Sequence, residues 1–444
     1  MTNRKSILRL GNSTKTISHE IPITSKKPTN EAIHIARPDN PCISCKGKNL
    51  ACGKFRCPII SKLKTYQTYL EEIDRKDLWG ASPPGVFVGT FGYPKVAVGP
   101  MVPPESGDTT IYDSTENWFG LPQRQILSYR MRLVRGKFEA RVDELESSRL
   151  LEITREIGLA KGSVETDVSF FKKPHQRIKL DVDVQPMGPS APLAKINIGS
   201  THTDHQIEKV YSDNNLKAKE AIILLASQGV AQSAITRALS MGLLGSGKLR
   251  QLVPTRWSIT AVDSTLGLHY WHQVQTLPLI NEIRVFESTY LANRFVVLML
   301  PEAWGYELVE AWFPQSAWNP GRNVAVVNDF EGIHGRKTYA KIGGCYYSAR
   351  NIVGQYLTGE RRQARTVILR ETYPGQEMPM GVWLVREMVR KALEFPYKTF
   401  DTLKEAFDHI SGRLLISPRD WINSSGILGH APEVRQKSLI SYLS

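Results

Sequence analysis

Four cysteines within sixteen residues restrict the fold of this chain more than any other feature of its sequence. They are Cys42, Cys45, Cys52 and Cys57, in the spacing C-x2-C-x6-C-x4-C. Zinc is bound tetrahedrally by four thiolates, and a C-x2-C turn brings two of the sulfurs to one ion. A Cys-Pro ending such as Cys57-Pro58 also occurs in iron–sulfur proteins, although their first three cysteines lie two residues apart. The spacing therefore predicts a metal site, with zinc favoured over an iron–sulfur cluster.

A site with four protein ligands is structural, because it leaves no open position for a substrate or a nucleophilic water. The fifth cysteine, Cys345, stands alone and is interpreted as a buried, inert thiol. The basic N-terminus has no apolar stretch behind it, and the longest apolar runs, such as residues 295–300, are far shorter than a membrane span. We therefore expect a cytoplasmic, nucleoid-associated protein with reduced thiols and no membrane partner.

The charge of the chain predicts an anionic partner. Fifty-seven Lys and Arg against 43 Asp and Glu give a formal net charge of +14, and the isoelectric point is about 9.4. Residues 1–80 alone contain 15 Lys and Arg against 7 Asp and Glu. More than half of the excess therefore lies in less than a fifth of the chain, and this basic end is the expected electrostatic contact.

Changes in composition divide the chain into four parts. Residues 1–38 lack hydrophobic periodicity and are predicted to form a flexible basic arm. Residues 39–80 contain the cysteine knuckle and an amphipathic helix that begins near Ile60 and ends near Asp77. Residues 81–425 form the body, and residues 426–444 form a flexible tail. The hydrophobic content of 41% is that of a globular protein.

The body has the patterns of an α+β fold with a large mixed sheet. Residues 81–104 contain two Val-rich segments around Gly-Tyr-Pro, which predicts a hairpin. Strands are further predicted at residues 178–184, 258–262, 283–285, 295–300, 324–328 and 366–369. Helices are predicted at residues 216–228, 231–241, 346–357, 382–394 and 402–410.

Three motifs in the body resemble functional sites but are better explained as ordinary structural elements. A Gly242–Lys248 match to a phosphate-binding loop lacks the Ser or Thr after the lysine and follows a helix, so a helix end and a turn explain it. Residues 225–238 have the skeleton of a helix-turn-helix, with Ser233, Thr236 and Arg237 on the expected exposed side, but two packed core helices fit better. The cluster at residues 201–205 is interpreted as a solvated polar loop.

Two groups of polar residues remain as candidate sites in the body. Asp181 and Asp183 alternate on a predicted strand and point to one face, where they either share a divalent cation or simply face solvent. Arg256 and Trp257 are candidates for gripping a phosphate and stacking on a base, and Asp263 is a candidate metal ligand. Alternatively, Arg256 and Asp263 form a buried ion pair that fixes a sheet.

The last nine residues have a spacing that is specific for one kind of partner. Gln436, Leu439, Tyr442 and Leu443 fit Q-x-x-h-x-x-a-a, the peptide that docks on sliding clamps of the PCNA type. One short helical turn places the apolar side chains in a shared hydrophobic pocket and the glutamine in a small polar one. Leu443 replaces the second aromatic residue, which should weaken docking without abolishing it.

Several stretches together resemble one family. They are the four-cysteine knuckle, residues 82–100, V-P-T-R-W-S-I-T-A-V-D at 253–263, G-V-W-L-V-R-E at 381–387, and the tail. In these stretches the chain resembles the archaeal Nre family of clamp-interacting DNA repair factors. The resemblance implies a role in the repair of DNA damage with the clamp as a partner, and it supplies no reaction.

Three hypotheses for function follow from these observations. The first is a DNA repair factor that is recruited by a PCNA-type clamp and binds DNA through basic surface and a structural zinc knuckle. The second is a metal-dependent nuclease that uses carboxylates such as Asp181, Asp183 or Asp263. The third is an RNA-binding protein without a clamp partner, because basicity and a zinc knuckle suit RNA equally well.

Overall fold

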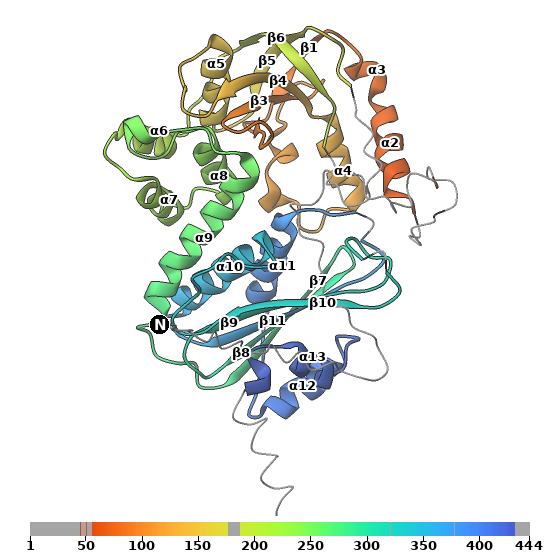
Figure 1. Cartoon of the computed structure of the whole chain (residues 1–444), viewed down its shortest axis with the longest axis vertical. Helices are drawn as coiled ribbons and strands as arrows, with labels where there is room; N and C mark the ends of the chain where they lie inside the picture. Colours follow the sequence, from red (N-terminus) through yellow and green to blue (C-terminus); the bar gives the residue numbers. More distant parts are fainter. Residues whose placement is uncertain are drawn as a thin grey trace, which may run out of the picture.

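Two mixed sheets organise the part of the chain that the computed structural model describes, namely Cys45, Leu50 and residues 56–175, 187–319, 321–376 and 378–430. Within these residues each sheet has six strands, and helices lie between and around the sheets (Figure 1). The α+β class is thus confirmed for the body, with two mixed sheets where the sequence predicted one large mixed sheet. The predicted basic arm and residues 431–444 of the predicted tail, with the clamp-binding peptide, lie outside the described residues.

The first sheet has the order β1-β5-β6-β4-β3-β2, in which only β4 and β6 are parallel. Along β5 alternate residues are buried, which is the period of a strand with one covered face. The strands are β1 (Asp77–Ser82), β2 (Val86–Val88), β3 (Lys95–Val102), β4 (Val134–Arg141), β5 (Val164–Phe170) and β6 (Ser190–Ile198). The helices of this part are α2 (Pro58–Thr68), α3 (Leu70–Ile73), α4 (Gln123–Arg132) and α5 (Arg149–Leu159).

The second sheet has the order β10-β9-β11-β8-β7-β12 and is covered by helices on both faces. Phe295, Val297 and Met299 of β8 pack in the core with α10 and α11, whereas the intervening Val296 and Leu298 pack with α12 and α13. The strands are β7 (Ile283–Tyr290), β8 (Asn293–Leu300), β9 (Gly305–Trp312), β10 (Ala325–Glu331), β11 (Arg365–Thr372) and β12 (Lys398–Phe400). The helices are α10 (Gly344–Glu360), α11 (Val382–Glu394), α12 (Leu403–Ser411) and α13 (Pro418–Ser424).

A long helix, α9 (Thr255–Val274), connects the two sheet regions (Figure 1). Val262 and Leu266 belong to the core that contains β2, β3 and three shorter helices, whereas Val274 belongs to the core of the second sheet. The shorter helices are α6 (His205–Ser212), α7 (Ala218–Ser227) and α8 (Gln232–Ser240). Because α9 packs into both cores, residues near its start face the junction between the two sheets.

The structure confirms many of the predicted elements and corrects one. The predicted hairpin is β2–β3. Four predicted strands correspond to β7, β8, β10 and β11, namely those at 283–285, 295–300, 324–328 and 366–369. The predicted helices from residue 216 onward correspond to α7, α8, α10, α11 and α12. The predicted strand at 258–262 is wrong, because these residues lie in α9. Its buried residues, Ser258, Val262 and Leu266, recur at the spacing of a helix rather than of a strand.

The helix predicted from Ile60 to near Asp77 is shorter than expected, since α3 ends at Ile73 and β1 already begins at Asp77. The predicted strand at 178–184 lies outside the described residues. Among the described helices, none combines the length and the apolar character that crossing a bilayer requires.

Candidate nucleic-acid interface

Three exposed aromatic side chains gather where the β2–β3 hairpin meets the start of α9. Trp257 is 47% exposed, Tyr93 is 46% exposed and Phe91, at the hairpin tip, is 94% exposed. The rings of Tyr93 and Trp257 lie 5.2 Å apart at an angle of 49°. We call Phe91, Tyr93 and Trp257 the aromatic surface. Large aromatic side chains are usually buried, so a group of three in solvent contact marks a binding surface.

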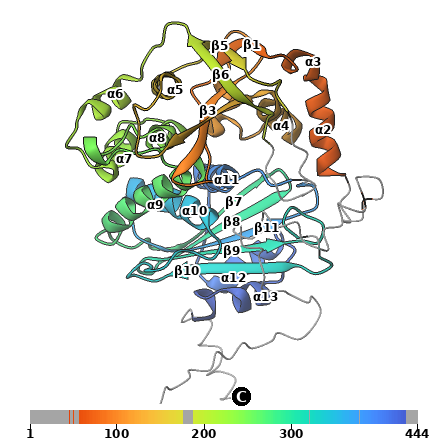
Figure 2. The same ribbon diagram turned by 45° about the horizontal axis from the view of Figure 1, so that its top comes forward.

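The hairpin is held against α9 in a defined position. The Val88 N–H donates to Thr255 Oγ1 over 3.0 Å, which ties β2 to the first residue of the helix. The turn contains Gly92 at φ +84°, where a side chain would come within 2.6 Å of the Lys95 carbonyl oxygen. Glycine is therefore required at this turn. Figure 2 shows the hairpin of β2 and β3 reaching down to the start of α9 beside α11.

Two more helices begin beside the start of α9. A side-chain carbon built on Gly344, the first residue of α10, would come within 2.9 Å of Val382 Cγ2 and 3.5 Å of Thr260 Oγ1. Val382 is the first residue of α11, and Thr260 lies one turn after Arg256 on the same face of α9. The N-termini of α10 and α11 therefore adjoin the first two turns of α9.

These helix N-termini carry uncompensated partial positive charge. The residues before α9, α10 and α11 are Pro254, Gly343 and Gly381, whose side chains cannot cap a helix, and none of the three helices has an acidic residue in its first turn. The first N–H groups of a helix have no partner within the helix and favour anions. Both glycines have positive φ, +75° and +103°, which keeps the approach to each helix open. The arrangement suits phosphate groups.

Basic and aromatic side chains continue the surface along the loop before α10. Tyr339 is 65% exposed, stacks near Tyr347 with ring centroids 5.3 Å apart, and its hydroxyl lies 3.9 Å from the position of a side-chain carbon on Gly343. Lys341 is exposed two residues before this glycine. Arg256 is exposed on α9, one helical turn before Thr260. We call this whole region, from the aromatic surface to Lys341, the candidate interface.

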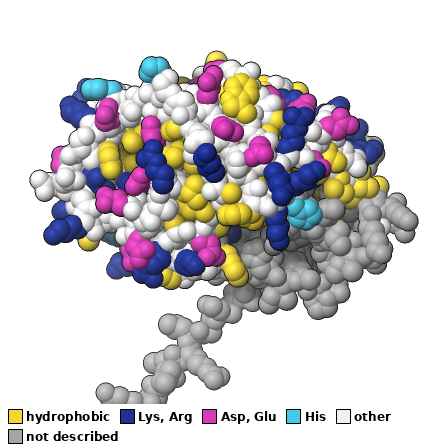
Figure 3. All heavy atoms as spheres, turned by 90° about the horizontal axis from the view of Figure 1, so that it is seen from above, with side chains coloured by type: hydrophobic (Ala, Val, Ile, Leu, Met, Phe, Trp, Pro, Cys, Tyr) yellow, Lys and Arg dark blue, Asp and Glu magenta, His cyan; other side chains and the backbone are white. Residues whose placement is uncertain are grey.

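No part of the face at the top of Figure 1 is marked by charge of one sign. Figure 3 shows this face, and over its described part basic and acidic side chains are intermixed with apolar ones. The candidate interface is distinguished instead by exposed rings next to helix N-termini. Such a combination contacts the two chemical parts of a nucleic acid, because rings stack on bases and N–H groups bind phosphates.

Asp263, one of the predicted site residues, lies inside the protein with its charge already paired. Its side chain is fully buried, and Arg386 of α11 donates to it through Nη2 and Nε, over 2.5 and 3.1 Å. Gln232 and Asn351 donate to the same carboxylate. Burial by itself lowers the pKa of Arg386, but the Asp263 carboxylate outweighs it, so that the pKa is raised.

The predicted ion pair between Arg256 and Asp263 is therefore wrong. Arg256 is solvent-exposed and lies about two helical turns before Asp263, and the partner of Asp263 comes from a segment more than a hundred residues later. A metal-ligand role for Asp263 also does not fit, since both oxygens accept hydrogen bonds, and the described residues contain no group of three His, Cys, Asp or Glu side chains placed to hold a metal.

The other predicted site residues lie partly or wholly outside the described region. Asp181, Asp183, Cys42, Cys52 and the tail residues are not described. Of the cysteine knuckle, Cys45 is buried and Cys57 is half-buried. Cys57 is the residue before α2, and Pro58 occupies the first helical position. Cys57 thus lies at a rigid helix start, where its position is fixed for the predicted ligand set.

Comparison with known proteins decides the family. The model for "Archaeal Nre, N-terminal" matches residues 51–319, and the model for "Archaeal Nre, C-terminal" matches residues 331–442. The chain belongs to the archaeal Nre family. A relative named DNA repair protein NreB, from Archaeoglobus fulgidus, is 40% identical over 403 residues, which covers 90% of this chain and 100% of the relative.

Two further relatives are both named DNA repair protein NreA. The one from Archaeoglobus fulgidus is 34% identical, with 90% of this chain and 98% of the relative covered, and the one from Haloferax volcanii is 29% identical, with 82% and 89% covered. No solved structure matches this Nre chain.

The buried ion pair joins the two parts of the Nre fold. Asp263 lies in the segment matched as N-terminal, and Arg386 lies in the segment matched as C-terminal. Both residues come from stretches that carry the resemblance in the sequence. Those stretches therefore serve two purposes: their buried side chains join the two parts, while Trp257, Gly381 and Val382 form the candidate interface.

The sequence indicated only part of this interface. Arg256 and Trp257 were identified from their block, whereas Tyr93, Tyr339 and the glycines before α10 and α11 were not. Their local signal is weak, because the glycines before Cys-Tyr-Tyr and before Val-Trp-Leu occupy a position at which glycine is only modestly enriched. Nothing in the local sequence says that these starts adjoin one another.

Proposed function

We propose that this Nre protein is a DNA repair factor that binds single-stranded or distorted DNA at the candidate interface. The observation that carries the proposal is the exposed Tyr93–Trp257 pair beside the uncapped N-termini of α10 and α11. The names of the relatives, DNA repair proteins NreA and NreB, support the repair role.

The geometry suits unpaired bases better than an intact duplex. A base in duplex DNA is covered on both faces, whereas an unpaired base offers a free face to Trp257 or Tyr93. Phosphates next to the stacked base are then within reach of the helix N-termini, Arg256 and Lys341. Lesions and repair intermediates expose unpaired bases, so stacking at this surface would favour damaged sites.

Two further parts of the proposal concern the ends of the chain. Cys42, Cys45, Cys52 and Cys57 hold one structural metal, zinc in preference to an iron–sulfur cluster, and the position of Cys57 at the start of α2 supports this. The tail docks on a PCNA-type sliding clamp through Gln436, Leu439, Tyr442 and Leu443. Such docking would raise the concentration of the body at DNA that carries a clamp.

Fluorescence anisotropy with labelled single-stranded DNA tests the interface. Replacing Trp257 by Ala should weaken binding about tenfold, and replacing Tyr93 as well should weaken it further, because base stacking contributes about 1–3 kcal/mol per base. Trp257→Phe should keep most of the affinity, since the smaller ring still stacks. Trp79→Ala is the matched control, because Trp79 is 53% exposed on the edge strand β1 of the first sheet.

Equal affinities of the wild type and the Tyr93→Ala/Trp257→Ala protein would contradict the proposal. The same titration with RNA of identical sequence separates the RNA-binding hypothesis, which predicts tighter binding of RNA than of DNA. The nuclease hypothesis now depends on Asp181 and Asp183, since Asp263 is paired with Arg386.

A further inference from the structure

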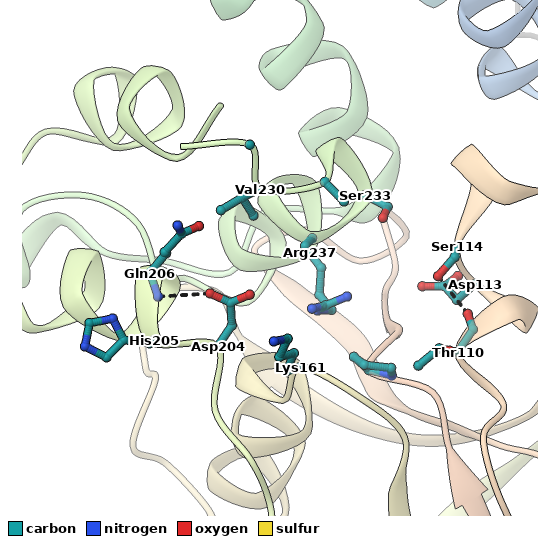
Figure 4. A pocket seen from close by; sticks show the side chains of 14 residues that line it. Thr110, Asp113, Ser114, Lys161, Asp204, His205, Gln206, Val230, Ser233 and Arg237 are labelled. Carbon is teal, nitrogen blue, oxygen red and sulfur yellow. Dashed lines mark hydrogen bonds between the residues drawn. The ribbon is translucent and has the colours of Figure 1, made fainter. Parts of the chain in front are cut away.

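A polar cavity of about 500 Å³ lies apart from the candidate interface, between the end of α5 and the starts of α6 and α8 (Figure 4). Ser233 and Arg237 of α8 line it, although the sequence suggested them as exposed residues of a helix-turn-helix. Thr236, the third residue of that set, is buried. The two helices α7 and α8 thus pack in the core, and their polar residues face a space large enough for a nucleotide-sized ligand.

Arg237 presents a fixed positive charge to this cavity. Its Nε donates to the Gly158 carbonyl oxygen over 2.9 Å and its Nη2 to the Ala160 carbonyl oxygen over 3.2 Å. Carbonyl groups orient the guanidinium without neutralising it, and in the described part of the chain no carboxylate lies within ion-pair distance. Burial lowers the pKa of Arg237, while the surrounding carboxylates act in the opposite direction. An anionic ligand would give this half-buried guanidinium a direct ion-pair partner.

Lys161 brings a second positive charge to the same space. Its backbone N–H donates to the His202 carbonyl oxygen over 2.8 Å, which fixes the chain directly after α5, and its side chain is exposed at the cavity. Figure 4 shows Lys161 and Arg237 between Asp204 on one side and Asp113 on the other. Two cations that converge from separate elements are suited to one phosphate group.

The carboxylates near the cavity offset part of this positive charge, since Asp113, Asp204 and Glu116 all raise the pKa of Arg237. Asp204 accepts the N–H groups of Gln206 and Ile207, so its charge serves to cap α6. Burial raises the pKa of Asp113, while its ion pair with Arg130, over 3.8 Å, and the charge of Arg237 act in the opposite direction. A side-chain carbon on Gly85 would come within 2.2 Å of Asp113 Oδ2, so only glycine leaves room for this carboxyl group. Asp113 and its neighbours Thr110 and Ser114 can accept hydrogen bonds from hydroxyl or amino groups.

We propose that this cavity binds the phosphate monoester of a nucleotide, with the phosphate between Arg237 and Lys161 and the sugar or base toward Asp113 and Ser114. The Glu116 carboxylate already accepts the Ser233 N–H at the start of α8, so the two side chains rather than the helix N-terminus hold the phosphate. The nucleotide is either free in solution or the 5′-phosphorylated end of a DNA strand. Both present the same terminal phosphate.

Calorimetric titration with deoxyadenosine 5′-monophosphate and with deoxyadenosine tests the free form. The monophosphate should bind at least about tenfold more tightly, since the nucleoside lacks the group that the cations contact. Lys161→Ala and Arg237→Gln should each remove about tenfold or more of the affinity. Lys209→Ala is the matched control, because Lys209 is exposed on α6 and does not line the cavity. Lys161→Ala changes only an exposed side chain and should therefore fold. It still tests the phosphate site if the Arg237→Gln protein does not fold.

Short oligonucleotides with and without a 5′-phosphate test the strand end. These titrations use the Tyr93→Ala/Trp257→Ala protein, so that base stacking at the candidate interface does not mask binding of the strand end in the cavity. A tenfold preference for the phosphorylated strand that disappears in Lys161→Ala would assign the cavity to a DNA end. If the monophosphate and the phosphorylated strand both bind no better than their unphosphorylated forms, or if Lys161→Ala and Lys209→Ala bind alike, the cavity is not a phosphate site.

Discussion

The buried pair of Asp263 and Arg386 gives the sharpest quantitative expectation for the stability of this fold. Asp263→Asn keeps the size of the side chain but removes its charge, which leaves the Arg386 guanidinium buried without a counter-charge. The amide group of the new side chain is also a donor, so at least one Arg386 donor would face another donor. Breaking a buried ion pair in this way costs about 3–5 kcal/mol of unfolding free energy.

Urea denaturation followed by tryptophan fluorescence measures this cost. The matched control is Asp408→Asn, which makes the same chemical change in the Lys404–Asp408 pair, where the side chains are 68% and 63% exposed. That control should change the unfolding free energy by no more than about 1 kcal/mol, because solvent screens an exposed pair.

A double variant separates loss of charge balance from loss of packing. Adding Arg386→Met to Asp263→Asn removes the uncompensated cation, so the double variant should lose less free energy than the sum of the two single changes. If Asp263→Asn and Asp408→Asn unfold at the same urea concentration, the Asp263–Arg386 ion pair does not stabilise the packing of the two sheet regions, and the expected cost is refuted.

Three other expectations concern separate parts of the chain. Gly381→Ala should lower the unfolding free energy by about 1–3 kcal/mol, because only glycine readily adopts φ +103° with ψ 176°. Gly359→Ala is the control and should change the thermal midpoint little, because Gly359 has open space around it and no positive φ. Elemental analysis should find about one equivalent of zinc in the intact protein and a clear loss in Cys57→Ser; zinc and iron together below about a tenth of an equivalent in the intact protein would exclude the metal site. Replacing Leu439 and Tyr442 by Ala should weaken clamp binding at least about a hundredfold by calorimetry, since two interface anchors are removed, and equal affinities would rule out the tail as the docking peptide.

Local sequence patterns predicted much of the second sheet and its helices. Along β8, apolar residues fill both faces, and in α11 the apolar positions recur at helical spacing, so each element was identified from its own residues. The β2–β3 hairpin was likewise identified from Gly-Tyr-Pro between two valine-rich segments. The family was identified from stretches spread along the chain, and the family models, over residues 51–319 and 331–442, match most of these stretches.

Strand β9 was missed because its local pattern misleads. Every residue of Gly305–Trp312 is buried, including Glu307 and Glu310, and charged residues in a short run argue against a core strand. Their charges are satisfied by distant groups: Arg370 donates to Glu310, and the backbone of Gly426 and Ile427 donates to Glu307. A buried charge is stable only with such partners, and no local window contains them.

What the sequence determined by itself was therefore the class of the fold, most elements of its second half, and two exposed residues of the candidate interface, Arg256 and Trp257. The tertiary structure decided that residues 258–262 are helical, that Asp263 pairs with Arg386, and that the starts of α10 and α11 adjoin that of α9. The physical reason is that periodicity and turn chemistry act over a few residues, whereas ion pairs and converging helix ends depend on which distant segments pack together.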